Sequence, residues 1–333
     1  MQPFSLYMQE WLYGPEGYYA VAPTIGARGD FVTSVAVSPF FGGTIANYLV
    51  RRIFSGHISR HCTVCEIGAH RGHLLADMVQ FIYTLDPLLL QTLEFVIVEP
   101  LPKLREAQAE YFKHSFGEAV RFRQVADLSD LATKEGFVVA NELFDAFSFE
   151  LINGEEWGVV DDHRILWQKA PDEVVTQAKA LGIHRGELAV GFESFAQKIA
   201  RAFECCEVIT FDYGQEAPRN DFSARIYAQQ RVWPLFEPDG LSAFYQKADL
   251  TADVNFDHLK RAFEASGFKA EGIKAQNVAL LEMGLGDLLE TLQEKAGYDN
   301  YRKEVGRVRA LLDPAMLGER FRMARFERGQ TPA

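Results

Sequence analysis

Few cysteines, no long apolar run and no surplus of basic residues characterise this 333-residue sequence. The four cysteines include the pair Cys62 and Cys65, but no second C-x-x-C pair completes a zinc set, so we expect no metal site. No segment reaches the roughly 18 uninterrupted apolar residues that a membrane-spanning helix needs. Residues 1–10 contain neither a basic region nor an apolar signal core. We therefore expect a cytoplasmic protein without membrane insertion.

The charge balance is acidic, with a formal net charge of −12 at pH 7. Such a charge argues against non-specific binding to nucleic acid, because phosphate backbones attract basic surfaces. It leaves a basic partner, such as an arginine-containing peptide, electrostatically suitable. The hydrophobic fraction of 48% and the charged fraction of 24% are ordinary for a globular protein.

The dinucleotide fingerprint G-x-G-x-x-G is also missing, which disfavours NAD and FAD. In its place an apolar run, Thr63–Ile67, meets a turn with Gly68 and Gly72 and then a helical segment. Glycines let the backbone turn sharply and approach a ligand, and the start of a helix offers free N–H groups to a negative group. A plain strand-to-helix turn without a ligand is the alternative.

A second apolar run, over residues 93–98, ends at Glu99. An acidic residue at the end of such a strand can accept hydrogen bonds from both ribose hydroxyls of a nucleoside. Because ligands of open α/β sheets lie at the carboxyl ends of the strands, the two segments together predict a nucleoside cofactor.

Strands and helices alternate along the core, which predicts a mostly parallel α/β sheet. A third strand is expected at Val120–Val125, just before Asp127 and Leu128, where an adenine contact would lie. Asp127 could equally cap the following turn. Further elements are expected as helices near 39–54, 72–84, 102–112 and 189–203, a hairpin around 161–163, and strands near 207–214, 270–273 and 320–326.

The fourth strand, Gly136–Ala140, leads directly into a polar cluster formed by Asn141, Glu142 and Asp145. Two acids and an amide at the carboxyl end of a strand predict that catalytic residues lie there. The alternative is that Asn141 and Asp145 only cap a helix or a turn.

The flanking segments complete one elaborated domain. Residues 1–57 are expected to form a helical and aromatic cap, in which Asp30 follows Gly29 in a segment suited to a binding loop. Residues 58–280 would form the core with its additions, 284–318 a helical insertion, and 319–333 the last strand and tail.

Taken in order, these motifs resemble the MidA-like (DUF185) family of class I S-adenosylmethionine (SAM) methyltransferases. Glu66, Gly68 and Gly72 match motif I of that class, E/D-x-G-x-G-x-G, and His70 replaces the middle glycine. The resemblance runs almost end to end. It further rests on the segments 12–13, 17–19, 29–34, 41–42, 98–100, 140–146, 211–214 and 249–256.

The resemblance implies a Rossmann-like sheet, mostly parallel with an antiparallel last strand, and SAM as the cofactor. It implies methylation of a protein arginine, with a respiratory-complex subunit as one substrate by analogy with the mitochondrial members. A scaffold with weakened catalysis and a methyltransferase of another acceptor are the alternatives. The cofactor contacts it implies are Glu66, Gly68, Gly72, Glu99, Asp127 and Leu128. The catalytic residues expected are Glu142, which would hold the arginine guanidinium, with Asn141, Asp145 and Asp30.

Overall fold

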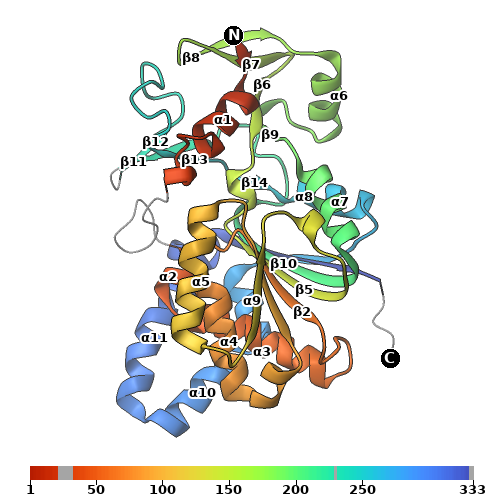
Figure 1. Cartoon of the computed structure of the whole chain (residues 1–333). Coiled ribbons are helices and arrows are strands. Elements are labelled where there is room, and N and C mark those ends of the chain that lie inside the picture. Colours follow the sequence, from red (N-terminus) through yellow and green to blue (C-terminus); the bar gives the residue numbers. More distant parts are fainter. Residues whose placement is uncertain (22–32, 229–230, 330–333) are drawn as a thin grey trace. The chain divides into compact units, whose positions relative to one another are not determined.

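A computed structural model describes residues 1–21, 33–228 and 231–329 of the chain (Figure 1). The backbone divides into two compact units. The first comprises Met1–Val32, Leu143–Phe195 and Tyr213–Ala262, and the second comprises Thr33–Glu142, Ala196–Asp212 and Phe263–Ala333. Among the described residues, no helix is long and apolar enough to cross a membrane.

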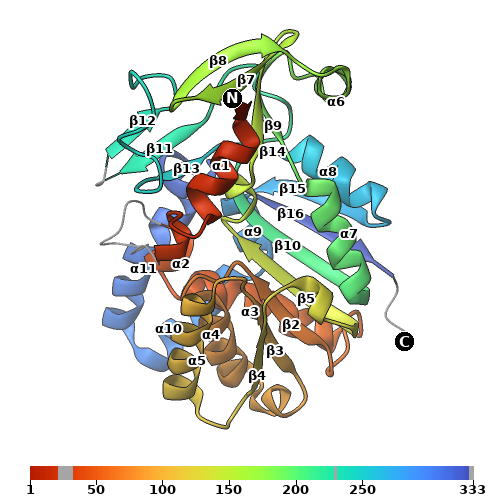
Figure 2. The same cartoon turned by 45° about the horizontal axis from the view of Figure 1, so that its top comes forward.

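The second unit is built on a sheet whose strands lie in the order β15-β16-β10-β5-β2-β3-β4 (Figure 2). Neighbouring strands from β10 to β4 run parallel, and β16 is antiparallel to β15. The predicted α/β class, with a mostly parallel sheet and an antiparallel last strand, is therefore confirmed. The bounds are β2 Thr63–Ile67, β3 Glu94–Val98, β4 Arg121–Val125, β5 Thr133–Asn141, β10 Phe203–Gln215, β15 Lys269–Ala275 and β16 Phe321–Arg328.

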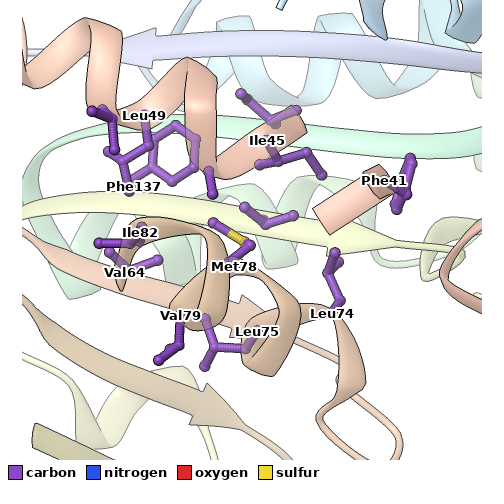
Figure 3. Close-up of a cluster of buried hydrophobic side chains, with 14 of the residues drawn as sticks. Phe41, Ile45, Leu49, Val64, Leu74, Leu75, Met78, Val79, Ile82 and Phe137 are labelled. Carbon is purple, nitrogen blue, oxygen red and sulfur yellow. The ribbon is translucent and has the colours of Figure 1, made fainter. Parts of the chain in front are cut away.

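One face of this sheet is covered by α3 (Phe40–Phe54) and α4 (His73–Leu85). Alternate strand residues such as Val64, Phe137 and Val139 enter this core, because successive side chains of a strand point to opposite faces. Figure 3 shows α3 and α4 side chains meeting Val64 and Phe137. Further helices of the second unit are α2 Ser34–Val37, α5 Pro102–Phe116, α9 Gln276–Glu282, α10 Leu285–Ala296 and α11 Tyr298–Leu312.

The first unit has its own core, where α1 (Phe4–Tyr13) packs its buried aromatic face against two small sheets. Phe4 stacks on Phe149 with ring centroids 5.4 Å apart, and the Trp11 indole donates to the Ala248 carbonyl at 2.8 Å. One sheet contains β1 Gln2–Pro3, β6 Phe149–Asn153, β7 Glu156–Asp161, β8 Arg164–Lys169 and β9 Arg185–Ala189, and the other contains β11 Arg225–Ala228, β12 Arg231–Pro234 and β13 Asp249–Thr251. The helix α6 Asp172–Ala180 and the short strand β14 Val254–Asn255 also belong to the first unit. The helix α8 Phe256–Ala265 begins in it.

Most expected elements are present, including the hairpin of β7 and β8 around residues 161–163. The helix expected over 189–203 was placed too early: β9 ends at Ala189, Gly191 has φ +105°, and α7 runs from Phe192 to Ala202. The elements α6, β6 and β9 were not predicted, whereas α1 lies in the segment expected to form a helical cap. Cys65 lies fully buried in β2. The single domain with its subdivisions stays a prediction.

Gly136 offers a test of the packing of β5 against β10. A Cβ atom at this position would lie 2.3 Å from the ring of Phe203, which is fully buried and has little room to move. We expect Gly136→Ala to lower the free energy of unfolding by about 1–3 kcal/mol, the usual cost of overpacking. Urea denaturation of the purified protein measures it.

The control is Gly286→Ala in α10, where no atom lies within 4 Å of the added Cβ. Because alanine restricts the unfolded chain more than glycine does, this variant should be unchanged or more stable by about 0.5–1 kcal/mol. Equal effects of the two substitutions would contradict the packing argument.

Candidate functional site

The carboxyl ends of the parallel strands meet along one edge of the second unit. Strand register pairs Ile67 with Val98 and with Ala140, Val98 with Val125, and Asn141 with Phe211. The segments that follow β2, β3, β4 and β5 therefore begin side by side, and they carry the predicted site residues of this unit.

The strand order reverses between β2 and β5. From β2 the chain moves outward through β3 to β4, and it then returns to form β5 on the other side of β2. In open α/β sheets such a switch point leaves a crevice outside the carboxyl ends of the two central strands, and ligands bind there. Here the turn after β2 and the Asn141–Glu142 turn after β5 flank that point.

The turn after β2 has a left-handed backbone at three positions. Gly68 has φ +72°, His70 has φ +46° and Gly72 has φ +79°. Histidine adopts this region more often than most side chains do, which fits its place in this turn. The Gln108 amide donates to the His70 carbonyl at 2.7 Å and holds the turn.

Gly72 has a steric role as well. A Cβ atom there would lie 3.1 Å from the ring of Phe112 and 3.3 Å from Ile97. Gly72 is also the N-cap of α4, and no side chain caps this helix start. Backbone N–H groups at an uncapped helix start suit the carboxylate of an amino acid.

Glu66 lies inside β2 with 4% of its surface exposed, and its carboxylate accepts the Leu75 N–H at 3.0 Å. It thus ties the strand to the first turn of α4. Burial raises the pKa of Glu66 to about 8, the Leu75 N–H opposes this shift, and the charges of Asp77 and Glu99 add to it. A neutral carboxyl group is therefore favoured in the folded protein without a ligand.

Glu99 follows β3 directly and is 3% exposed. Its Oε1 accepts the Leu101 N–H at 3.0 Å, which fixes the carboxyl group at the strand end. Burial raises the pKa of Glu99 to about 7, against the opposing effects of this N–H and of Arg105. A buried carboxyl group at this position suits a diol, since ribose hydroxyls supply two donors, and its role as a ribose contact stays a prediction.

Asp127 caps the turn that follows it, which was the alternative to its predicted contact with an adenine. Its Oδ1 accepts the Ser129 N–H at 2.9 Å at the start of the 3-10 turn η3 (Leu128–Asp130), and its Oδ2 bonds Lys198 at 2.7 Å. These bonds hold the pKa of Asp127 at about 2, with the Lys198 hydrogen bond as the largest cause. Leu128 is buried at 3% exposure. Contact of this pair with an adenine stays a prediction.

Asn141 and Glu142 form a strained turn at the end of β5. Glu142 has φ +51°, an unusual value for a residue without a short polar side chain, and its N–H donates to the Phe211 carbonyl at 2.9 Å. The Asn141 amide donates to Glu142 Oε1 at 3.0 Å and orients the carboxylate. The turn η4 (Phe144–Ala146) begins at Leu143 with no side-chain cap, so neither Asn141 nor Asp145 caps it.

The other two predicted catalytic residues do not belong to the described part of the second unit. Asp145 belongs to the first unit, where it is 5% exposed. Burial raises the pKa of Asp145 to about 6, opposed by a hydrogen bond from Tyr213. Asp30 lies outside the described residues. The roles of both stay predictions.

Two residues of the second unit were missed by sequence reasoning. Gln108 is fully buried and links His70 to Gln124, whose amide donates to Gln108 Oε1 at 2.7 Å; no sequence signal marks it. Asp77 is a half-buried carboxylate that lies on the same side of α4 as the exposed His73 and Gln80, so no break in the helical pattern marks it.

The raised pKa of Glu66 predicts a pH dependence of stability. Its carboxyl group contributes stability that is fully present below about pH 4.5 and is lost as pH rises toward about 8. Glu66→Gln keeps an acceptor for Leu75 but cannot ionise. From pH 5 to 8, thermal or urea unfolding should show the variant gaining stability relative to the wild type by about 1 kcal/mol per pH unit at most.

The matched control is Glu94→Gln on β3, which removes one negative charge from an ion pair with Arg123. A difference between Glu66→Gln and the wild type that stays constant from pH 5 to 8 would contradict the assignment.

The left-handed turn predicts opposite outcomes at two neighbouring positions. His70→Gly should change the unfolding free energy little, because relief of backbone strain offsets the greater freedom of the unfolded chain. Gly72→Ala should lower it by at least about 1 kcal/mol, since the added side chain meets both a left-handed backbone and Phe112. Comparable losses in the two variants, measured by urea denaturation, would show that the turn tolerates no substitution at all.

Curated relatives cover most of the chain. The rat protein arginine methyltransferase NDUFAF7, mitochondrial, is 28% identical over 95% of this chain and 78% of its own length. The human protein of the same name is 25% identical over 95% of this chain and 77% of its own length. Because these relatives are named as mitochondrial, the expectation of a cytoplasmic protein is contradicted.

Solved structures show the same fold. A Burkholderia thailandensis protein with bound S-adenosylhomocysteine superposes with a TM-score of 0.81 at 24% identity, over 99% of this chain and 89% of its own. A native crystal structure from Burkholderia thailandensis gives a TM-score of 0.79 over 99% of this chain and 88% of its own.

The family model described as S-adenosyl-L-methionine-dependent methyltransferase matches residues 44–274. This range contains the glycine turn, Glu99 and the Asn141–Glu142 turn. The predicted SAM dependence and methyltransferase activity are thereby confirmed. The chain belongs to the MidA-like family of SAM-dependent methyltransferases.

Proposed function

We propose that this methyltransferase acts on an arginine side chain of a protein or peptide. The curated relatives are named protein arginine methyltransferases at 24–28% identity and support this acceptor. The net charge of −12 agrees with a basic substrate. A respiratory-complex subunit as the physiological acceptor rests on family resemblance alone.

The Asn141–Glu142 turn is the observation that carries the proposal. It places a carboxylate, oriented by the Asn141 amide, beside the switch point at the carboxyl end of β5. The left-handed backbone at Glu142 costs on the order of 1–3 kcal/mol, and strain of this kind concentrates at functional sites. A carboxylate can hold a guanidinium through two parallel hydrogen bonds and leave its remaining nitrogen directed elsewhere.

Each group of site residues would position a different part of the two substrates. SAM supplies an electrophilic methyl group on a positively charged sulfur. Glu99 would hold the ribose, and the glycine turn with the start of α4 would hold the methionine part. Glu142 would align an arginine nitrogen so that the new N–C bond forms in line as the S–C bond breaks, and the nitrogen then releases a proton. Alignment of this kind supplies much of the rate gain in a displacement.

The test is Glu142→Gln, which keeps the shape of the side chain and removes its charge. We expect turnover on arginine peptides to fall about tenfold to hundredfold, the value of a hydrogen bond between charged groups, with SAM affinity unchanged. Radiolabelled methyl transfer measures turnover, and isothermal titration calorimetry measures SAM binding.

Glu135→Gln is the matched control, since Glu135 lies at the amino end of the same strand and accepts the Ser59 N–H. Its turnover should equal that of the wild type. Methyl transfer that persists when lysine replaces every arginine of the peptide would indicate another acceptor. Unchanged turnover of Glu142→Gln would remove Glu142 from the proposed role.

A further inference from the structure

Asp77 is a half-buried carboxylate without a partner at the interface of α3 and α4. Its neighbours on α4, Leu74 and Met78, belong to the hydrophobic core. Within residues 1–21, 33–228 and 231–329, no hydrogen bond or ion pair reaches the Asp77 carboxylate. Glu66 and Glu99, the other buried acids near the glycine turn, each accept a backbone N–H.

Close approach of the two helices makes the space for Asp77. A Cβ atom on Gly42 of α3 would lie 2.8 Å from the Asp77 Cβ and 3.1 Å from the Leu74 carbonyl oxygen. Figure 3 shows Phe41 and Leu74, the neighbours of this contact, on the facing helices. The missing side chain at Gly42 is thus what allows an acid at this interface.

The direction of the side chain brings the carboxylate toward the helix start. Helical side chains point back toward the N-terminus and cover the turn before their own α-carbon. Asp77 therefore lies over the first turn of α4, whose amides follow the Gly72 cap. Its charge also raises the pKa of Glu66, which places the two carboxyl groups within electrostatic reach of each other.

An unpaired carboxylate at this interface costs stability. Burial is the cause that raises the pKa of Asp77 to about 7. Acids buried among apolar groups normally acquire a partner, and groups left without one concentrate where a ligand supplies it. A cationic group of a ligand bound at the glycine turn would complete the pair.

SAM carries two such cations, the sulfonium and the ammonium of its methionine part. The methionine carboxylate suits the first backbone amides of α4, ahead of the Leu75 N–H that already donates to Glu66, and the ammonium is bonded to the same α-carbon. The sulfonium lies farther along the chain of the ligand and must present its methyl group to the acceptor. The first turn of α4 therefore matches the amino acid end and not the sulfur.

We propose that the Asp77 carboxylate receives the ammonium of the methionine part of SAM bound at the glycine turn and the start of α4. Asp77 is then a cofactor-positioning residue of this enzyme. The inference rests on the SAM dependence of the family and not on the identity of the methyl acceptor, so a failure of the arginine proposal leaves it intact.

Asp77→Asn tests this assignment by calorimetric titration without any acceptor. Three ligands separate the charges: SAM, S-adenosylhomocysteine, which lacks the positive sulfur, and the analogue of S-adenosylhomocysteine in which hydrogen replaces the amino group. We expect the variant to bind the first two about tenfold to hundredfold more weakly than the wild type, by a similar factor, and the third with unchanged affinity.

Two controls accompany the titration. Asp86→Asn removes the same charge at the other end of α4, from a residue paired with Arg60, and should leave the affinity for all three ligands unchanged. The melting temperature of ligand-free Asp77→Asn at pH 8 should equal or exceed that of the wild type, because an unpaired carboxylate has been removed.

Three results would overturn the proposal. Unchanged affinity of Asp77→Asn for SAM would remove Asp77 from the cofactor. A loss confined to SAM would assign Asp77 to the sulfonium. An equal loss for all three ligands, or a lower melting temperature, would show that Asp77 only maintains the packing of α3 on α4.

Discussion

Parallel pairing of β2 with β5 is the constraint on which the methyltransferase unit depends. The register Ile67 to Ala140 makes the Gly68 turn and the Asn141–Glu142 turn start side by side, although they are more than 70 residues apart in sequence. The strand order reverses at this pair, and such a switch point is where open α/β sheets bind their ligands. A shift by one residue would turn Glu66 and Val64 away from α3 and α4.

Two buried acids of the second unit, which the sequence predicts as cofactor contacts, also hold the turns of the fold together. The carboxyl groups of Glu66 and Glu99 each accept a backbone N–H from the segment that follows, and these bonds fix the turns. Burial nevertheless raises the pKa of both groups above their ordinary values. The folded protein without a ligand therefore bears the cost of burying these two carboxyl groups, and its stability depends on pH.

Position 70 shows that a departure from a sequence motif need not change the backbone conformation. Motif I expects a glycine there, and the resemblance alone left the consequence of a histidine open. In the structure the histidine adopts the left-handed conformation itself, and buried Gln108 holds its carbonyl. Gly72 has no such freedom, because Phe112 and Ile97 fill the space that a side chain would need.

The sequence by itself determined the α/β class and the strand-turn-helix at residues 63–85, because local periodicity and glycine spacing survive in a linear pattern. The family and SAM as the cofactor followed from the resemblance of its motifs to the MidA-like methyltransferases. It also indicated Glu99 and Glu142 as strand-end acids. Only the tertiary structure decided that Asp127 caps a turn against Lys198, that Asp145 belongs to another unit than Glu142, and that the Asp77 carboxylate packs beside Gly42 without a hydrogen bond or ion pair to any residue that the structure describes. These properties depend on burial and on contacts between residues distant in sequence, and a local sequence pattern determines neither of them.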